Sequence, residues 1–211
     1  NLMGAEKFNV MGLSQGSLLA RYVAQLCDTP TPPNNLLTIG SPSMGTEAIP
    51  NCTSGIFCDM INKLADSAVY FKFAQHIIGP AGYFRNPKDM KDYLADSVFL
   101  PSLNNEKDHP KTDFNKQRFT SLNGIMMAEF SKDTMIYPKE TAVFGSHDSE
   151  GKLIAMEDQP IYKSDAFGLK TQNEAGKIKK VIIDGEHLQF TKADISNIFV
   201  PFLKNGITAE K

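Results

Sequence analysis

The stretch "FNVMGLSQGSLLARYVAQL", residues 8–26, decides the fold, because a serine stands between two glycines where one pattern gives way to another. Residues 8–13 are short and apolar and show no helical period. Beyond them, apolar side chains recur at helical spacing: Leu18, Leu19, Tyr22, Val23 and Leu26. The stretch therefore predicts a strand, a tight turn at Ser14, and a helix that buries those five side chains on one face.

The turn has the form G-x-S-x-G, with Gly12, Ser14 and Gly16. In such a turn the serine is exposed on strained backbone, and we expect a Cβ at either glycine to collide where strand and helix approach. A serine hydroxyl is a poor nucleophile at neutral pH. The motif therefore requires a base and an orienting acid from elsewhere in the chain.

Composition excludes several classes of function. The 211 residues carry 22 basic and 24 acidic side chains, so no nucleic-acid partner is indicated. The chain has no Walker loop, zinc-finger spacing or H-E-x-x-H motif, so we expect no metal or organic cofactor. No apolar run approaches the roughly 20 residues of a membrane span, so we expect a soluble chain without stable membrane insertion. The oligomeric state is not indicated.

The pattern along the chain predicts three parts. Residues 1–46 form hydrolase core, with "LLTIG" (36–40) as a buried strand. Residues 47–122 form an inserted helical cap, in which "DMINKLADSAVYFKFAQHII" reads as one helix with a single buried face, made by Ile61, Leu64, Ala68 and Phe71. Residues 123–211 resume the core with strands in "NGIMMAEF" and "KIKKVIIDG".

The last part is predicted in more detail. Residues 137–176 are expected to be irregular, and the strand that follows is expected to bury Val181, Ile182 and Ile183 without interruption. "TKAD" resembles a capping box of Thr191 and Asp194. The closing helix is expected to bury three side chains and to be interrupted or ended by Pro201; the three are Ile195, Ile198 and Phe199.

Three polar residues follow three of these strands. Ser14, Asp133 and His187 stand in the chain order of the α/β-hydrolases. The imidazole would accept the serine proton during attack, and the carboxylate would hold the imidazole in one tautomer. We therefore expect these residues to be the nucleophile, the acid and the base. The backbone N–H of Gln15 is the expected oxyanion donor, with a second donor from an earlier strand upstream of this chain.

Each assignment has rivals. His76 lies on the predicted cap helix, and His109 and His147 lie in polar loops, whereas His187 lies between a buried strand and a capped helix. Asp184 and Glu186 compete with Asp133 for the acid role. Both are so close to His187 in sequence that they would reach its Nδ1 with difficulty.

The cysteines and the start of the chain carry further expectations. Cys52 and Cys58 enclose five residues and suit a small disulfide loop in an oxidising compartment. Cys27 is left over, either as a buried free thiol or as the partner of an upstream cysteine. Asn51 begins an N-C-T sequon and is a candidate glycosylation site. Few residues precede the first strand, so we expect the chain to begin in the middle of a fold.

Long segments in the same order resemble the palmitoyl-protein thioesterases: "MGLSQGSLLARYVAQLC", "PNCTSGIFCDMINKL", "FLPSLNNEK", "FSKDTMIYPKETAVFG" and "DGEHLQF". The resemblance implies an α/β-hydrolase fold, in which a parallel sheet flanked by helices carries a helical cap. It also implies the catalytic set Ser14, Asp133 and His187, a Cys52–Cys58 disulfide, and pairing of Cys27 with a cysteine upstream.

The activity implied by the resemblance is hydrolysis of palmitoyl thioesters on cysteines of proteins or peptides, without a cofactor. It further implies a lysosomal or secreted protein whose signal peptide lies upstream. Two alternatives remain open. One is a lipase or carboxylesterase acting on oxygen esters, since the G-x-P-x-x-G from Gly40 to Gly45 also occurs in lipases. The other is a catalytically incompetent fragment that lacks the first strands and the second oxyanion donor.

Overall fold

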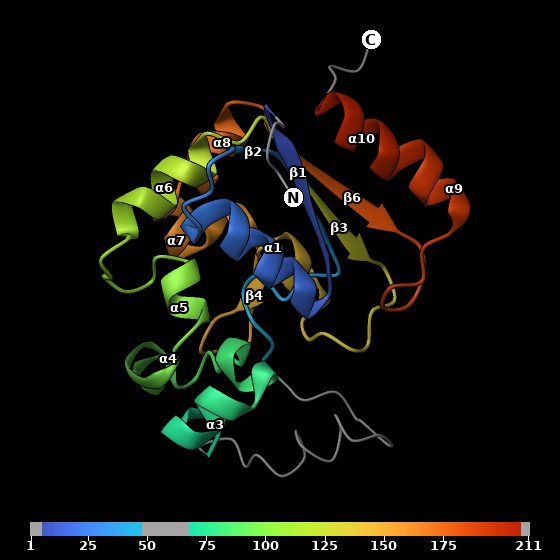
Figure 1. The fold of residues 1–211 in the computed structure, drawn as a ribbon. Helices are drawn as coiled ribbons and strands as arrows, with labels where there is room; N and C mark the ends of the chain where they lie inside the picture. Colours follow the sequence, from blue (N-terminus) through green and yellow to red (C-terminus); the bar gives the residue numbers. More distant parts are fainter. Residues whose placement is uncertain (1–5, 48–67, 208–211) are drawn as a thin grey trace.

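A parallel sheet organises the molecule. The computed structural model describes residues 6–47 and 68–207. The sheet has the order β1-β2-β3-β6 (Figure 1). Its strands are β1 (Phe8–Leu13), β2 (Pro33–Ile39), β3 (Gly124–Phe130) and β6 (Ile178–Ile183). Every neighbouring pair is parallel. The segments that follow β1, β3 and β6 therefore emerge at the same edge of the sheet.

Helices cover both faces of the sheet, as predicted for an α/β fold. Figure 1 shows α9 (Lys192–Asp194) and α10 (Val200–Asn205) on one side. The other side carries α1 (Gln15–Leu26), α6 (Thr112–Thr120), α7 (Pro160–Lys163) and α8 (Leu169–Glu174). Strand alternation explains the two cores: Leu36 packs toward α1 and α6, whereas Leu37 packs toward α10. Each fully buried leucine contributes about 1.5–3 kcal/mol.

The elbow helix α1 buries part of the predicted face, since Leu18 and Leu26 are buried and Val23 is half-buried. Leu19 is 57% exposed and Tyr22 is 41% exposed, whereas Arg21 and Gln25 are buried. The polar side chains have partners inside: Arg21 Nη2 donates to Asn104 Oδ1 (2.9 Å), and Gln25 Nε2 donates to Asn115 Oδ1 (2.6 Å). A count of apolar spacing misses this face because its partners come from distant residues.

Between β2 and β3, the described residues form helices. These are η1 (Ala68–Tyr70), α3 (Lys72–Ile77), η2 (Gly79–Tyr83), α4 (Met90–Asp96), α5 (Leu100–Leu103) and α6. The single helix predicted here is wrong in its described part, because Phe71 is extended (φ −64°, ψ 137°) and separates η1 from α3. Phe71 is also 66% exposed rather than buried. Ile61 and Leu64 lie outside the described residues.

Short elements replace much of the irregular stretch predicted for residues 137–176. Besides α7 and α8, they are η3 (Lys139–Val143), β4 (Ser146–His147), β5 (Leu153–Ile154) and η4 (Met156–Asp158). β4 and β5 form a small antiparallel pair, with Ser146 opposite Ile154. The pattern missed them because each element is too short to show a period.

Strand β6 is present as predicted, but it is not buried throughout. Within the described residues it pairs with β3 alone and forms an edge of the sheet. Ile183 is 4% exposed, whereas Ile182 is 71% exposed and Val181 is half-buried. Continuous apolar letters therefore do not distinguish a central strand from an edge strand.

The C-terminal helices begin where predicted and continue past the predicted stop. Thr191 and Asp194 form the capping box. Phe199 is buried, but Ile195 is 40% exposed. Pro201 lies in the first turn of α10, directly after the π-helical turn η5 (Ile195–Phe199). Proline lacks an N–H and crowds the carbonyl four residues earlier; the wider turn before Pro201 accommodates it, so the helix continues.

Candidate active site

The elbow between β1 and α1 holds Ser14 in a strained conformation. Its φ is 51° and its ψ is −131°, and its N–H donates to Ile39 O (2.8 Å). A non-glycine residue at positive φ is uncommon and marks sites that the surrounding fold over-determines. The strain turns the hydroxyl away from the sheet, at the carboxyl end of β1.

The two glycines of the motif differ in what they allow. A Cβ on Gly12 would lie 2.3 Å from Gly16 O and 2.5 Å from Ser17 Cα, which are backbone atoms. A Cβ on Gly16 would meet nothing within 4 Å among the described residues. The expectation that both glycines prevent a collision is therefore correct for Gly12 and wrong for Gly16.

Ser14, His187 and Asp133 form one chain of hydrogen bonds. His187 Nε2 is 2.9 Å from Ser14 Oγ, and His187 Nδ1 is 2.6 Å from Asp133 Oδ2. The side chains are shielded from solvent, with Asp133 3% and His187 12% exposed. A carboxylate at Nδ1 fixes the proton on that nitrogen, so Nε2 faces the serine as an acceptor.

Asp133 is held by its own loop. Its Oδ1 accepts the backbone N–H groups of Met135 (2.9 Å) and Ile136 (3.0 Å), while Oδ2 contacts His187. Both carboxylate oxygens are therefore engaged, which fixes the direction of the carboxylate with little freedom to rotate. A tight turn directly after β3 supplies these donors.

The imidazole rests against a glycine that the sequence analysis had not connected with the site. Gly40 follows β2 with φ 60°, and a Cβ there would lie 3.1 Å from His187 Cε1. The edge of Phe130 contacts the ring from β3, with the ring centroids 6.2 Å apart. The sequence feature that could have indicated this contact is the position of Gly40 directly after the buried strand β2.

The rival acids serve to join two loops. Asp184 accepts from Ser131 Oγ (2.7 Å) and pairs with Lys132, and these contacts lower the pKa of Asp184, with the serine hydrogen bond as the larger cause. Glu186 Oε2 accepts from Thr134 Oγ1 (3.0 Å). Both contacts tie the loop after β3 to the loop after β6, so they position the loops that carry Asp133 and His187.

The other histidines lie apart from Ser14. His76 is exposed on α3, and the His109 ring contacts Asn105 Oδ1 (3.0 Å). His147 Nδ1 is 2.6 Å from Glu47 Oε2, which makes a second carboxylate–imidazole pair. The sequence analysis missed this pair because its members are a hundred residues apart.

The start of α1 can supply a donor to a developing oxyanion. The first N–H groups of a helix have no intrahelical acceptor, and the N–H of Gln15 is the first of α1. The side chain of Gln15 lies against η2, since a Cβ on Gly79 would be 2.7 Å from Gln15 Nε2. The segment that contains Gly79 therefore touches the residue next to Ser14.

Several expectations fall outside the described residues or find no test there. Cys52, Cys58 and Asn51 lie outside them. Cys27 directly follows α1, is half-buried and forms no disulfide within the described residues. Among the described residues, no three ligand-type side chains gather as a metal site. In the same residues, every helix is too short or too polar to cross a membrane.

Comparison with known proteins now bears on this geometry. The family model for palmitoyl protein thioesterases matches residues 1–187. The chain belongs to this family. The resemblance read from the segments is thereby confirmed, together with the α/β-hydrolase type of fold.

Individual thioesterases align over most of the chain. The Caenorhabditis elegans palmitoyl-protein thioesterase 1 is 32% identical over 194 residues, which cover 90% of this chain and 64% of that protein. A Drosophila melanogaster homologue of the lysosomal thioesterase PPT2 is 32% identical over 202 residues, covering 92% of this chain and 67% of that protein. A Schizosaccharomyces pombe thioesterase–phosphatase fusion is 30% identical, and the chain spans 32% of it. The chain thus spans less than two thirds of two of these relatives.

Proposed function

We propose that this protein hydrolyses long-chain acyl thioesters, with S-palmitoyl cysteine of proteins or peptides as the substrate class. The observation that carries the proposal is the hydrogen-bond chain from Ser14 through His187 to Asp133. Family membership supports the choice of a thioester, because the relatives are named palmitoyl-protein and lysosomal thioesterases.

The chemistry runs in two halves. Ser14 Oγ attacks the thioester carbonyl carbon while His187 Nε2 takes the hydroxyl proton, and Asp133 stabilises the imidazolium that forms. The tetrahedral intermediate collapses, the carbon–sulfur bond breaks, and the imidazolium protonates the departing thiolate. Water then attacks the acyl-Ser14 ester while His187 takes its proton. The bond between the carbonyl carbon and Ser14 Oγ breaks, the imidazolium returns the proton to Oγ, and the fatty acid is released.

Hydrolysis of a thioester requires little protonation of the leaving group by this site. A thiolate leaves with less need of protonation than an amine, so the site must mainly stabilise the oxyanion. The N–H of Gln15 at the start of α1 would supply one donor, which is typically worth about 10²–10³ in rate. The second donor is expected from outside the described residues.

The proposal extends to organisation and location. Residues 1–46 and 123–211 would form the hydrolase core, and residues 47–122 the cap that shelters the acyl chain. The contact between Gln15 and Gly79 supports a cap that borders the active site. A lysosomal or secreted location is proposed because relatives are named lysosomal thioesterases.

The test compares a thioester with an oxygen ester as substrate, and the wild-type protein with two variants. We expect hydrolysis of an S-palmitoyl cysteine peptide with a higher kcat/KM than its O-palmitoyl serine counterpart. Ser14→Ala should lower kcat by about 10⁶-fold, toward the rate left by binding and oxyanion stabilisation. Ser121→Ala, at an exposed serine directly after α6, is the matched control and should leave kcat unchanged.

The alternatives give different results in the same assay. A preference for the oxygen ester would favour a carboxylesterase. Absence of turnover with both substrates, in a protein that unfolds cooperatively, would indicate that these residues alone are not a competent enzyme.

A further inference from the structure

A groove runs along the boundary between the segment Arg85–Met90 and the core. It consists of two adjoining cavities, of about 330 Å³ and about 560 Å³, which share Pro87, Lys88, His147 and Asp148 in their lining. We call this the cap-edge groove. Its volume is large enough for several residues of a peptide, and drug-sized ligands occupy cavities of this order.

The smaller cavity adjoins the loop that carries Asp133. Tyr137 lines it and follows Asp133 by four residues, so their Cα atoms lie at most about 14 Å apart. Glu47 lines it too, and its backbone N–H donates to Tyr137 O (2.8 Å). A substrate held at Ser14 could therefore extend into the cap-edge groove within a few residues.

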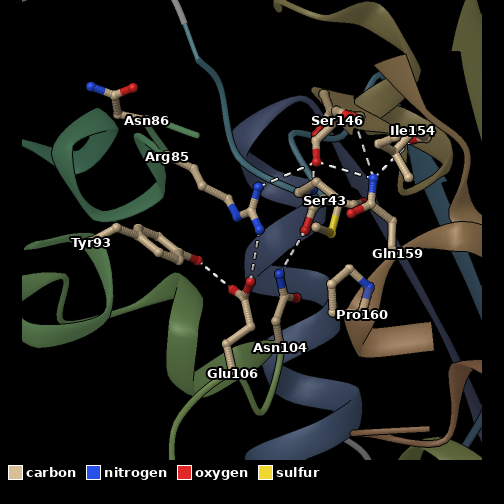
Figure 2. Close-up of polar contacts among 12 residues, drawn as sticks. Ser43, Arg85, Asn86, Tyr93, Asn104, Glu106, Ser146, Ile154, Gln159 and Pro160 are labelled. Atoms are coloured by element: carbon tan, nitrogen blue, oxygen red, sulfur yellow. Dashed lines mark hydrogen bonds and ion pairs between the residues drawn. The ribbon is translucent and has the colours of Figure 1, made fainter. Parts of the chain in front are cut away.

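The wall of the larger cavity is preformed by a buried polar network (Figure 2). Arg85 donates to Ser146 Oγ (3.3 Å) and pairs with Glu106 Oε1 (3.2 Å). Gln159 Nε2 donates to Ser146 Oγ (3.1 Å) and Ile154 O (2.8 Å). Arg85 is 8% exposed, and its Nε has no hydrogen-bond partner among the described residues.

The acidic side chains in and beside the groove already have hydrogen-bond or ion-pair partners. Tyr93 Oη donates to Glu106 Oε2 (2.5 Å), so Glu106 is satisfied from two sides. Glu47 binds the ring and the backbone N–H of His147. Asp148 Oδ1 accepts two backbone N–H groups of its own turn, and Asp158 pairs with Lys163.

The basic side chains that line the groove have fewer such partners. Lys88 is exposed at the groove, and its Nζ forms no ion pair among the described residues. His147 also lines the groove, and Glu47 engages its Nδ1. The uncharged lining is mixed: Pro87, Met90 and Pro160 are apolar, whereas Asn86 and Ser149 are polar. The groove therefore suits a ligand with an apolar body and a negative charge that reaches Lys88.

The two halves of a thioester substrate differ in this respect. The acyl chain carries no charge and would desolvate Lys88 without giving it a partner, which is costly. The peptide half is polar and carries carboxylates. We propose that the cap-edge groove binds the peptide half of the substrate and that Lys88 contacts a carboxylate on it. This inference rests on the proposed function and names where its leaving group lies.

The test measures binding without hydrolysis. The ligands are short peptides with an S-hexadecyl cysteine, a thioether that cannot be cleaved, ending in either a carboxylate or a carboxamide. Calorimetry on the wild-type protein should give about three- to fivefold tighter binding of the carboxylate, the range of a partly exposed ion pair. Lys88→Met should abolish this preference, and Lys88→Arg should keep it.

A matched control separates this contact from general charge. Lys91→Met, at an exposed lysine that does not line the groove, should leave the preference intact. Equal binding of both peptides by the wild type, an equal loss in both lysine-to-methionine variants, or no measurable binding would each overturn the inference. Failure of the proposed function is a separate outcome, in which the preference appears but palmitoyl thioesters are not hydrolysed.

Discussion

Asp133 uses its two carboxylate oxygens differently. Oδ1 accepts two backbone N–H groups of its own turn, and Oδ2 faces His187 Nδ1. The first contact fixes the carboxylate within its loop, and the second fixes the imidazole relative to Ser14. Removing the charge while keeping the shape therefore tests the second contact with little disturbance of the first.

We expect Asp133→Asn to lower kcat for a palmitoyl thioester by about 10⁴-fold, because an amide favours the wrong tautomer of His187. Steady-state kinetics should show KM changed much less. Asp113→Asn is the control, since Asp113 is exposed on α6. A similar loss of kcat in both variants would contradict the assignment of Asp133.

Among the elements, the elbow depends on close approach of β1 and α1. Ser17 Oγ donates to Gly12 O (2.7 Å) and accepts from Ile39 N (3.2 Å), so it joins the helix to two strands. The backbone of Gly16 passes directly over Gly12. This contact explains why the first glycine of the motif is needed sterically and the second is not.

Gly12→Ala should destabilise the protein by about 3 kcal/mol or more, because the added Cβ meets backbone that cannot move alone. Gly16→Ala should instead leave the free energy of unfolding unchanged or raise it by up to about 1 kcal/mol, since alanine favours a helix. Urea unfolding of both variants measures this. Equal destabilisation would show that the two glycines are sterically equivalent after all.

For the whole molecule, a buried acid in the sheet links the free energy of unfolding to pH. Glu129 of β3 is 8% exposed. Burial raises its pKa, Glu140 and Asp133 add to the rise, and Lys139 and Lys180 oppose it. The folded state therefore holds this proton more tightly than the unfolded chain, whose ordinary glutamate value is 4.5. As pH rises from 4.5 through the raised pKa, Glu129 makes the folded state less stable.

Glu129→Gln should consequently raise the free energy of unfolding at pH 7 and change it much less at pH 4. Glu157→Gln is the opposite control: burial acts to raise the pKa of Glu157, but the hydrogen bond and charge of Lys180 together with a backbone hydrogen bond outweigh it, and the net pKa is lowered. Its removal should lower stability at pH 7. Urea titrations at both pH values measure the difference. An equal effect of Glu129→Gln at both pH values would contradict the linkage.

The local order of residues along the chain determined where several strands and helices lie. The change of period at Ser14 located β1 and α1, the apolar runs located β2, β3 and β6, and the Thr191–Asp194 spacing located the helix cap. These features depend on residues within one or two turns of each other. The order of Ser14, Asp133 and His187 after three strands also led to the three side chains that contact one another.

The tertiary structure alone decided which faces are buried and which distant polar groups meet. Arg21 turns inward because Asn104 lies there, Ile182 is exposed because β6 is an edge, and Glu47 meets His147 across a hundred residues. Hydrophobic period measures the chance of burial and carries no information about a partner far along the chain. Such pairings depend on how the completed elements pack.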